Sequence, residues 1–287
     1  MRVLVYTDGS KDAEQAAVLL EKLGVARGGE VTIFAVSPRQ EQEDELEQSA
    51  DRIEHTLEDD ASNVRTVIRR GDANRQFMEE AEQGHYDLVI VAREHHGRPP
   101  RLRFRSTTSE LAKHVPAHLL VARNVPDKLR RILICSAAET PSAETVRLAG
   151  LITAGSGAEI SLLHVMSQVP LRSDSPEEDL QASAEGAIER HTHEGEHFEA
   201  AIAALRAAGV TGDIRPILRH GLVVDEVLDE IKQGQYDLLV VGSHRQPTLT
   251  RWLDVLLDDV TGELLLKTPI STLIIYQQKA PAGAEPS

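Results

Sequence analysis

Short apolar runs alternate along the chain with segments in which apolar residues recur at helical spacing. Four of the runs in the first half are residues 3–6, 31–36, 88–91 and 119–121, bounded by charged residues or glycine. Consecutive apolar positions are typical of parallel strands that helices cover on both faces. Further along, Leu46, Ala50, Ile53 and Leu57 fall on one face of a helix, and charged and polar residues fill the other. The pattern predicts repeated β-α-β units and an α/β fold.

The same pattern occurs twice along the chain. Residues 2–5 and 30–36 recur at 131–134 and 159–165, in both cases 129 residues later, whereas residues 83–91 recur at 233–241, 150 residues later. The second half therefore carries 21 additional residues between these blocks, which we expect to lengthen its second helix to about residues 176–208. Within the blocks Gly84 matches Gly234, and we expect each glycine to end a helix in the left-handed conformation. The repeat predicts one domain over residues 1–125, a second over 126–278, and a mobile tail over 279–287.

Composition excludes several classes of protein. The 287 residues, 41% of them hydrophobic, can form one large core or two ordinary ones. The 46 acidic and 31 basic residues give a formal charge of -15, which repels nucleic acid and anionic lipid. The single cysteine, Cys135, cannot form an intrachain disulfide, and no apolar run approaches the roughly 20 residues of a membrane span. We expect a cytoplasmic protein, with neither nucleic acid nor membrane as its partner.

Several short motifs follow one another in the same order in both halves. In the first half, an apolar strand leads into Asp8-Gly9-Ser10, Gly71-Asp72 opens a helix, Tyr86-Asp87 precedes another apolar strand, and Pro116 precedes the last strand. In this order the motifs resemble a universal stress protein domain, and the chain to about residue 278 resembles a tandem member of the UspA-like family. The resemblance implies that each half is a Rossmann-like domain, similar to adenine nucleotide alpha hydrolases, with a five-stranded parallel sheet of order 3-2-1-4-5. It also implies that the halves pair through their last strands about a pseudo-two-fold axis. A homodimer and an unidentified protein partner are further possibilities.

The family resemblance also locates a nucleotide-binding site after the fourth strand of each half. The first half lacks the glycines of this site. ATP-binding members carry Gly-x2-Gly-x9-Gly-Ser/Thr after the fourth strand, because small residues let the backbone approach the phosphates. At the three glycine positions stand Ala92, His95 and Arg105. The resemblance still assigns Asp8 to the adenosine side of the nucleotide and Val36, at the end of the second strand, to the contact with the base. The candidate nucleotide-binding residues are Asp8, Val36, Ala92, Arg103, Arg105, Ser106 and Thr107.

Basic residues crowd the segment that follows Ala92. Five arginines and two histidines lie between residues 93 and 105 of an otherwise acidic chain. One hypothesis is an anion pocket for a nucleotide or a phosphorylated metabolite, because an arginine can meet a phosphate with two donors. The other, which we favour, is a solvated loop that neutralises the acidic helix around residues 41–47.

The second half has replaced more of the site. Gly242 and Ser243 keep their positions, but Arg245 replaces the second glycine, and Asp258 and Asp259 stand at the third glycine and the serine. A carboxylate about 4 Å from a phosphate oxygen opposes it by about 4 kcal/mol at an effective dielectric constant of about 20. We therefore expect this half, including Val165 at the base-contact position, to be a degenerate site that does not hold ATP unless a divalent cation bridges the charges.

One further motif has the spacing of a zinc hydrolase. His193, Glu194 and His197 fit His-Glu-x-x-His, in which two histidines on one helical face bind zinc. The motif falls on the long second helix, which we expect to be exposed, and catalysis would need a third ligand and a cleft. We expect no functional metal here, and keep the zinc-dependent hydrolase as a remote alternative.

Together these patterns predict a binding or regulatory module of the stress response that is not a dedicated enzyme. We expect no catalytic residue and no obligatory cofactor. The main alternative is a sensor that binds ATP or AMP in the first half alone, with weak hydrolysis not excluded.

Overall fold

A computed structural model describes residues 1–37, 43–92, 115–136, 142–166, 183–189, 191–244 and 254–277. Within these ranges, the side chains of residues 142–144, 244, 254–259 and 277 are not described. The predicted tail over 279–287 lies outside the described residues.

The first half alternates strands and helices, as its hydrophobic pattern predicts. Its elements are β1 (Arg2–Thr7), α1 (Lys11–Leu23), β2 (Glu30–Ser37), α2 (Glu43–Leu57), β3 (Asn63–Arg70), α3 (Ala73–Gln83), β4 (Leu88–Ala92) and β5 (His118–Ala122).

The second half repeats this order with two helices in the place of α2, a 3-10 helix after its first α-helix, and a helix before its last strand, where residues 93–114 of the first half are not described. Its elements are β6 (Arg131–Cys135), α5 (Ser142–Thr153), the 3-10 helix η2 (Ala154–Ser156), β7 (Glu159–Met166), α6 (Ala184–Glu189), α7 (His193–Ala207), β8 (Ile214–His220), α8 (Val223–Gly234), β9 (Leu238–His244), α9 (Asp254–Lys267) and β10 (Ser271–Gln277).

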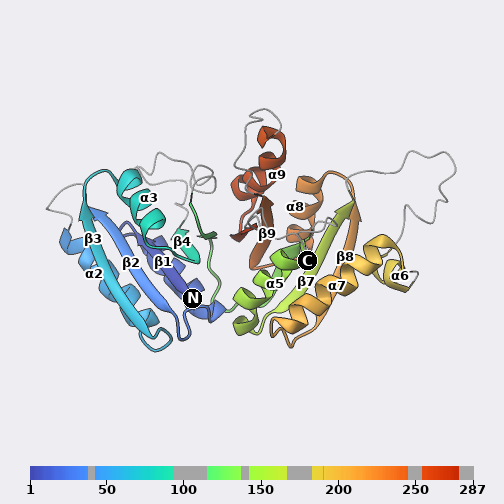
Figure 1. The fold of residues 1–287 in the computed structure, drawn as a ribbon, viewed down its shortest axis with the longest axis horizontal. Coiled ribbons are helices and arrows are strands. Elements are labelled where there is room, and N and C mark those ends of the chain that lie inside the picture. The colour runs from blue at the N-terminus through green and yellow to red at the C-terminus, as the bar shows by residue number, and fades with distance from the viewer. Residues whose placement is uncertain are drawn as a thin grey trace, which may run out of the picture.

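The ten strands that the structure describes form one continuous sheet, in the order β3-β2-β1-β4-β5-β10-β9-β6-β7-β8 (Figure 1). Counted within each half, the order is 3-2-1-4-5, and all strand pairs within a half are parallel. Among the described strands, one pair is antiparallel: it joins β5 to β10, with Leu120 opposite Leu273. The structure therefore has the predicted strand order and the predicted pairing through the last strand of each half.

Side chains extend the hydrogen bonding at both ends of the β5–β10 pair. The Ser271 hydroxyl accepts a hydrogen bond from the Arg123 amide and donates one to the Arg123 carbonyl, both at 3.0 Å. At the other end, the Tyr276 amide donates to His118 Nδ1 at 3.2 Å. These side chains add hydrogen bonds to a join with only three paired residues on each strand.

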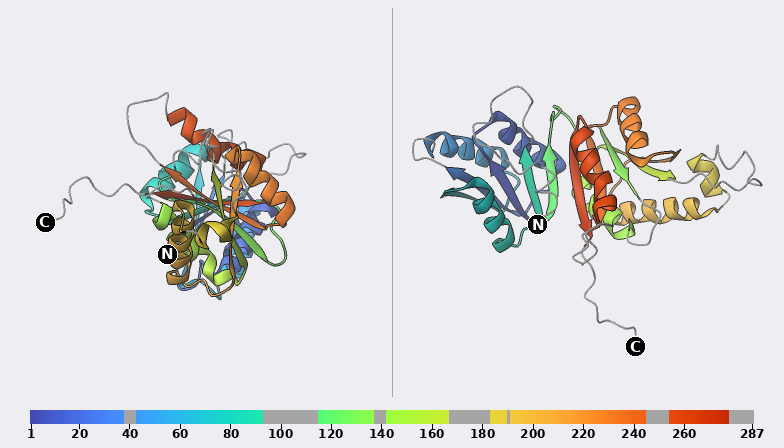
Figure 2. Two further views of the ribbon diagram at one scale, coloured as in Figure 1. Left: turned by 90° about the vertical axis from the view of Figure 1, so that its right-hand side faces the viewer. Right: turned by 90° about the horizontal axis from the view of Figure 1, so that it is seen from above.

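Helices cover both faces of the sheet, and each face has a core that runs through both halves (Figure 2). One core takes Val3 and Val5 from β1 together with apolar residues of α1, α2, α5 and α7. The other core takes the alternate residues Leu4 and Tyr6 together with apolar residues of α3, α8 and α9. Successive side chains of a strand point to opposite faces, which is why β1 is apolar at consecutive positions.

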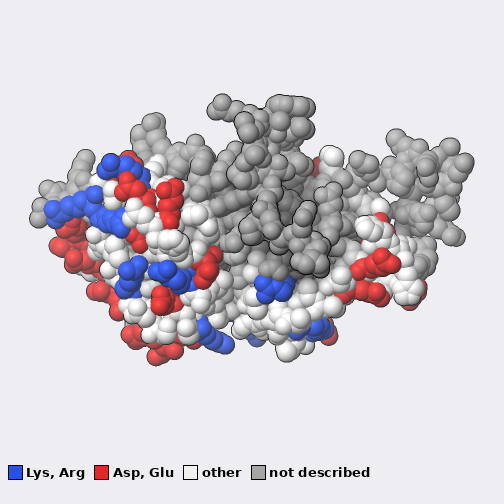
Figure 3. Space-filling model, in the orientation of Figure 1, with Lys and Arg blue, Asp and Glu red and all other residues white. Residues whose placement is uncertain are grey.

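Ion pairs link the charged side chains on the surface of the first half. Figure 3 shows basic and acidic side chains side by side on this face of the molecule. The pairs in this half include Arg2–Glu30, Arg27–Asp60, Arg52–Glu14 and Arg70–Glu43. These arginines are therefore interspersed with acids. None of the helices that the structure describes has the length and apolar character needed to cross a membrane.

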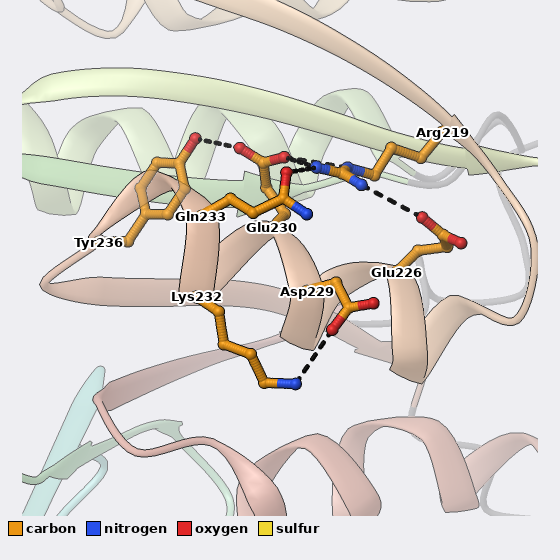
Figure 4. A network of polar contacts seen from close by, with 7 residues as sticks. All are labelled: Arg219, Glu226, Asp229, Glu230, Lys232, Gln233 and Tyr236. Carbon is orange, nitrogen blue, oxygen red and sulfur yellow. Dashed lines mark hydrogen bonds and ion pairs between the residues drawn. The ribbon is translucent and has the colours of Figure 1, made fainter.

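A buried polar network occurs at the same place in both halves. Figure 4 shows the network of the second half. In the second half, Arg219 donates from Nε to Glu230 at 2.9 Å, and the Tyr236 hydroxyl donates to the other oxygen of Glu230 at 2.8 Å. In the first half, Arg69 donates from Nη2 to one oxygen of Glu80, and the Tyr86 hydroxyl donates to the other. Each pair of equivalent residues is 150 positions apart, but the sequence analysis did not identify this network.

The prediction for Gly84 and Gly234 is wrong. Gly84 has a right-handed φ of -77°, Gly234 is the last residue of α8, and the left-handed residues are His85 and Gln235, with φ of 49° and 52°. The glycines are needed because the tyrosine two positions later folds over them. A Cβ added at Gly84 or Gly234 would lie 2.0 or 2.1 Å from that tyrosine ring.

The prediction of one long helix over residues 176–208 is also wrong. The described part of this segment forms two helices, α6 and α7, with His191 between them at a left-handed φ of 51°. The Thr192 side chain accepts a hydrogen bond from the Gly195 amide at 3.3 Å and so begins α7 as its N-cap. At Gly195, an added Cβ would lie 2.2 Å from the Ala187 carbonyl oxygen. A capping threonine and a glycine at the contact with α6 therefore give two closely packed helices.

Candidate functional site

Each half has a topological switch point, where the chain leaves the central strand and the sheet continues in both directions. In the first half, β1 lies between β2 and β4, so that Asp8, Val36 and Ala92 lie at the same edge of the sheet. In the second half, β6 lies between β7 and β9, and Val165 and Gly242 take the places of Val36 and Ala92. Ser136 is equivalent to Thr7, and the position equivalent to Asp8 is Ala137, which lies outside the described residues. Crevices at the carboxyl ends of such strands are where open α/β sheets bind ligands.

The turn after β1 fixes Asp8 in place. Its Oδ1 accepts a hydrogen bond from the Ser10 amide at 3.0 Å, and the Thr7 hydroxyl accepts one from the Gly9 amide at 3.1 Å. Gly9 has a φ of 82°, which favours glycine, and Ser10 begins α1 by accepting from the Ala13 amide at 3.2 Å. The result is a partly exposed carboxylate held beside the N-terminus of a helix.

A hydroxyl pair holds α2 against the end of β1. Thr7 Oγ1 is hydrogen-bonded to Ser49 Oγ at 3.0 Å, and both residues are fully buried. This contact involves no ionisable group.

In the second half, two histidines occupy the equivalent place. His197 Nε2, on α7, is hydrogen-bonded to Ser136 Oγ at 2.9 Å, and His164 Nδ1, on β7, to the Ser136 carbonyl oxygen at 3.0 Å. The two imidazole rings lie 5.3 Å apart between centroids, and both contact the ring of Phe198. Ser136 and His197 thus repeat the Thr7–Ser49 contact with an imidazole in place of a hydroxyl.

Burial changes the chemistry of the polar groups at this edge. Burial, reinforced by the neighbouring His164, lowers the pKa of His197 to about 4, so that its imidazole is neutral at pH 7. Burial also raises the pKa of the Cys135 thiol to about 12, with a smaller contribution from the charge of Glu230. Neither group is therefore ionised near neutral pH.

Comparison with known proteins identifies the family. The model of the universal stress protein family matches residues 1–123 and 128–275. The chain belongs to the universal stress protein family. It is a tandem member, with two matching segments in one chain.

Solved structures share the fold of this tandem universal stress protein. A universal stress protein from Archaeoglobus fulgidus DSM 4304 is 14% identical with a TM-score of 0.61, and the match covers 96% of each chain. A functionally unknown protein from Pseudomonas aeruginosa PAO1 is also 14% identical, with a TM-score of 0.64, and the match covers 96% of this chain and 92% of that one. The cytoplasmic domain of a prokaryotic cation chloride cotransporter is 12% identical with a TM-score of 0.51, over 95% and 94% of the two chains. No protein of curated function matches the sequence significantly.

The structure describes only part of the predicted phosphate-binding segments of this universal stress protein. Arg103, Arg105, Ser106, Thr107 and Arg245 lie outside the described residues. Asp258 and Asp259 belong to α9, but their side chains are not described.

The two residues that keep the family pattern in the second half lie on β9. Gly242 is exposed, and a Cβ added there would lie 3.0 Å from the Thr145 methyl carbon on α5. Ser243 is buried. The described structure thus brings Asp8, Val36 and Ala92 together in the first half and Val165, Gly242 and Ser243 in the second.

The His-Glu-x-x-His motif begins α7, and its two histidines have different surroundings. His193 is exposed, whereas His197 is half-buried and hydrogen-bonded to Ser136, so the expectation of an exposed motif is wrong for His197. Burial opposes ionisation of Glu194, but hydrogen bonds from its own amide and from Thr192 outweigh burial and lower its pKa. Among the described side chains, no group of three or more histidines, cysteines or acids is arranged to hold a metal ion.

Proposed function

We propose that this tandem universal stress protein is a non-catalytic binding and regulatory module of the stress response. It acts by association with a ligand or a protein partner, and its domains extend over residues 1–125 and 126–278. The observation that carries the proposal is the difference between the two switch points. The first keeps the Asp8 corner beside a helix N-terminus. In the second, the sequence has Ala137 at the position of Asp8, and His197 contacts Ser136 where the first half has the Thr7–Ser49 pair.

The chemistry of the second switch point supports a non-catalytic role. A general base works best with a pKa near the operating pH, whereas burial lowers the pKa of His197 to about 4. A cysteine nucleophile must form a thiolate, whereas burial raises the pKa of Cys135 to about 12. Both groups are therefore poorly suited to activate a substrate at neutral pH.

A second candidate function is the binding of ATP or AMP by the first half alone. The fixed carboxylate of Asp8 supports it, because such a group can accept hydrogen bonds from ribose hydroxyls, and Val36 follows on the neighbouring strand. In the second half the equivalent position is Ala137, which has no carboxylate.

Calorimetric titration with ATP and AMP, combined with a phosphate-release assay, tests both proposals. The non-catalytic module predicts no phosphate release above the uncatalysed rate. The nucleotide proposal predicts one site per chain, lost in Asp8→Ala and retained in Ser243→Ala, which makes a small change at the second switch point.

Each proposal has its own contrary result. Phosphate release that depends on the protein and exceeds that of a heat-denatured sample refutes the non-catalytic module. Two equivalent sites per chain, or binding that survives Asp8→Ala, refutes nucleotide binding by the first half alone. Absence of binding also removes the nucleotide proposal and leaves the non-catalytic module in place.

A further inference from the structure

In each half, a helix between the second and third strands is held at the end of the first strand, and the two contacts that hold it are equivalent in place but differ in chemistry. In the first half, α2 is held at the end of β1 by two hydroxyls, Thr7 and Ser49. In the second half, α7 is held at the end of β6 by the Ser136 hydroxyl and the His197 imidazole. Only the second contact includes a group that can gain a proton between pH 7 and pH 4.

The surroundings of His197 oppose the protonated form. The ring is half-buried, lies 5.3 Å from the His164 ring between centroids, and contacts Phe198. A charge placed there loses part of its hydration, and a charge on His164 would repel it. An imidazolium could still donate to the Ser136 hydroxyl, so the cost of protonation comes from the buried charge and not from the loss of that hydrogen bond.

The titratable side chains that shift the pKa of His197 come from two elements. His164 of β7 and His193 of α7 disfavour its protonation, and Glu194 of α7 favours it, as the smallest of these effects. No described side chain of α5 or α6, which also pack against α7, is among the groups that shift its pKa. The balance of burial and charge therefore favours the neutral ring.

We propose that the Ser136–His197 contact is an acid-sensitive latch, which releases the start of α7 from the end of β6 while the first half stays closed. In water the imidazole takes up a proton more readily than in the closed contact, so a falling pH favours the open form. This regulatory device does not depend on nucleotide binding or on the absence of catalysis.

The sign of the effect follows from the two pKa values of His197. The contact has its full stability above the ordinary histidine pKa of about 6.5, and loses stability as the pH falls from there towards about 4. Between pH 7.5 and 5.5 this difference raises the opening constant by up to about tenfold. Partial exposure of the ring makes the change smaller than this limit.

Hydrogen exchange measured by mass spectrometry at pH 7.5 and 5.5, with correction for the intrinsic exchange rates, tests the latch. Peptides from α7 are expected to lose protection by several-fold at pH 5.5, and peptides from α2 to keep theirs. The variant His197→Ser copies the hydroxyl pair of the first half and is expected to abolish the pH dependence. The variant His193→Ser removes the exposed histidine one turn earlier and is expected to retain it.

Two results overturn the proposal. One is protection of α7 that does not change between the two pH values, and the other is a pH dependence that His197→Ser retains. Should His197→Ser fail to fold, the carbon NMR signals of the His197 ring in the unmodified protein decide the matter. Titration near pH 4 supports the latch, and titration near pH 6.5 overturns it.

Discussion

The buried carboxylate of Glu230 provides the sharpest test of how the second half is held together. Its side chain is only 8% exposed and accepts hydrogen bonds from both Arg219 and Tyr236 (Figure 4). Replacing Glu230 by glutamine keeps the shape and removes the charge, so that the side-chain NH2 group must face one of the two donors. Arg219 is left without its main counter-ion, although Glu226 at 3.4 Å and Gln233 at 3.0 Å still accept from it.

The expected cost of Glu230→Gln follows from these contacts. Breaking a buried ion pair costs about 3–5 kcal/mol, and a hydrogen bond to a charged group contributes about 1.5–3 kcal/mol. Because Arg219 keeps two acceptors and is 22% exposed, we expect the lower part of the first range, about 3 kcal/mol. The quantity to measure is the free energy of unfolding in urea, from the midpoint at unchanged slope.

A second carboxylate on the same helix provides the control. Asp229 pairs with Lys232 at 3.0 Å, but their side chains are 54% and 73% exposed. An exposed pair contributes little, so Asp229→Asn should change the unfolding free energy by less than about 1 kcal/mol. If Glu230→Gln costs no more than Asp229→Asn, burial of the network is not what stabilises α8 against β8, and the reasoning fails.

Two further predictions concern the contact between η2 and α1, which belong to different halves, and the single cysteine. Gly155 of η2, in the second half, lies against the end of α1, in the first half. Gly155→Ala should destabilise the protein by more than about 1 kcal/mol in thermal or urea unfolding, because the new Cβ would lie 2.7 Å from the Leu23 carbonyl oxygen. Equal stability would show that these two backbone segments can separate without cost. Because burial raises the pKa of its thiol to about 12, the partly buried Cys135 should resist iodoacetamide at pH 8 in the folded protein and react after unfolding, as followed by intact mass. Equal rates in both states would contradict a raised thiol pKa in the folded protein.

The repeat made most of the fold predictable from the sequence. Matching blocks 129 and 150 residues apart assign equivalent strands to each half, and consecutive apolar positions indicate strands buried on both faces. The family resemblance then supplied the strand order, which the structure confirms. The prediction is wrong where a local signal has two physical explanations. A glycine at position 84 suits a left-handed turn, but in the structure it leaves room for the ring of Tyr86.

The candidate site was predictable to a smaller extent. The Asp8-Gly9-Ser10 turn is local, so neighbouring residues alone indicated a fixed carboxylate at the end of a strand. His197 was assigned to an exposed helix, because the break between α6 and α7 and the contact of α7 with Ser136 were not recognised. A signal for the break was present in Thr192 followed by Gly195, which suits an N-cap and a close helix contact.

The sequence by itself determined the two copies, the alternation of strands and helices, and the corner at Asp8, because each depends on residues that are close along the chain or repeated at a fixed interval. Only the tertiary structure decided which distant side chains meet. Ser136 and His197 are 61 positions apart, and Thr7 and Ser49 are 42 apart, yet both pairs form the same contact. Hydrophobic periodicity gives the face of an element but not its partner. Which side chains meet is set when helices and strands pack against one another. That packing placed the His197 imidazole in the second half where the first half has the Ser49 hydroxyl.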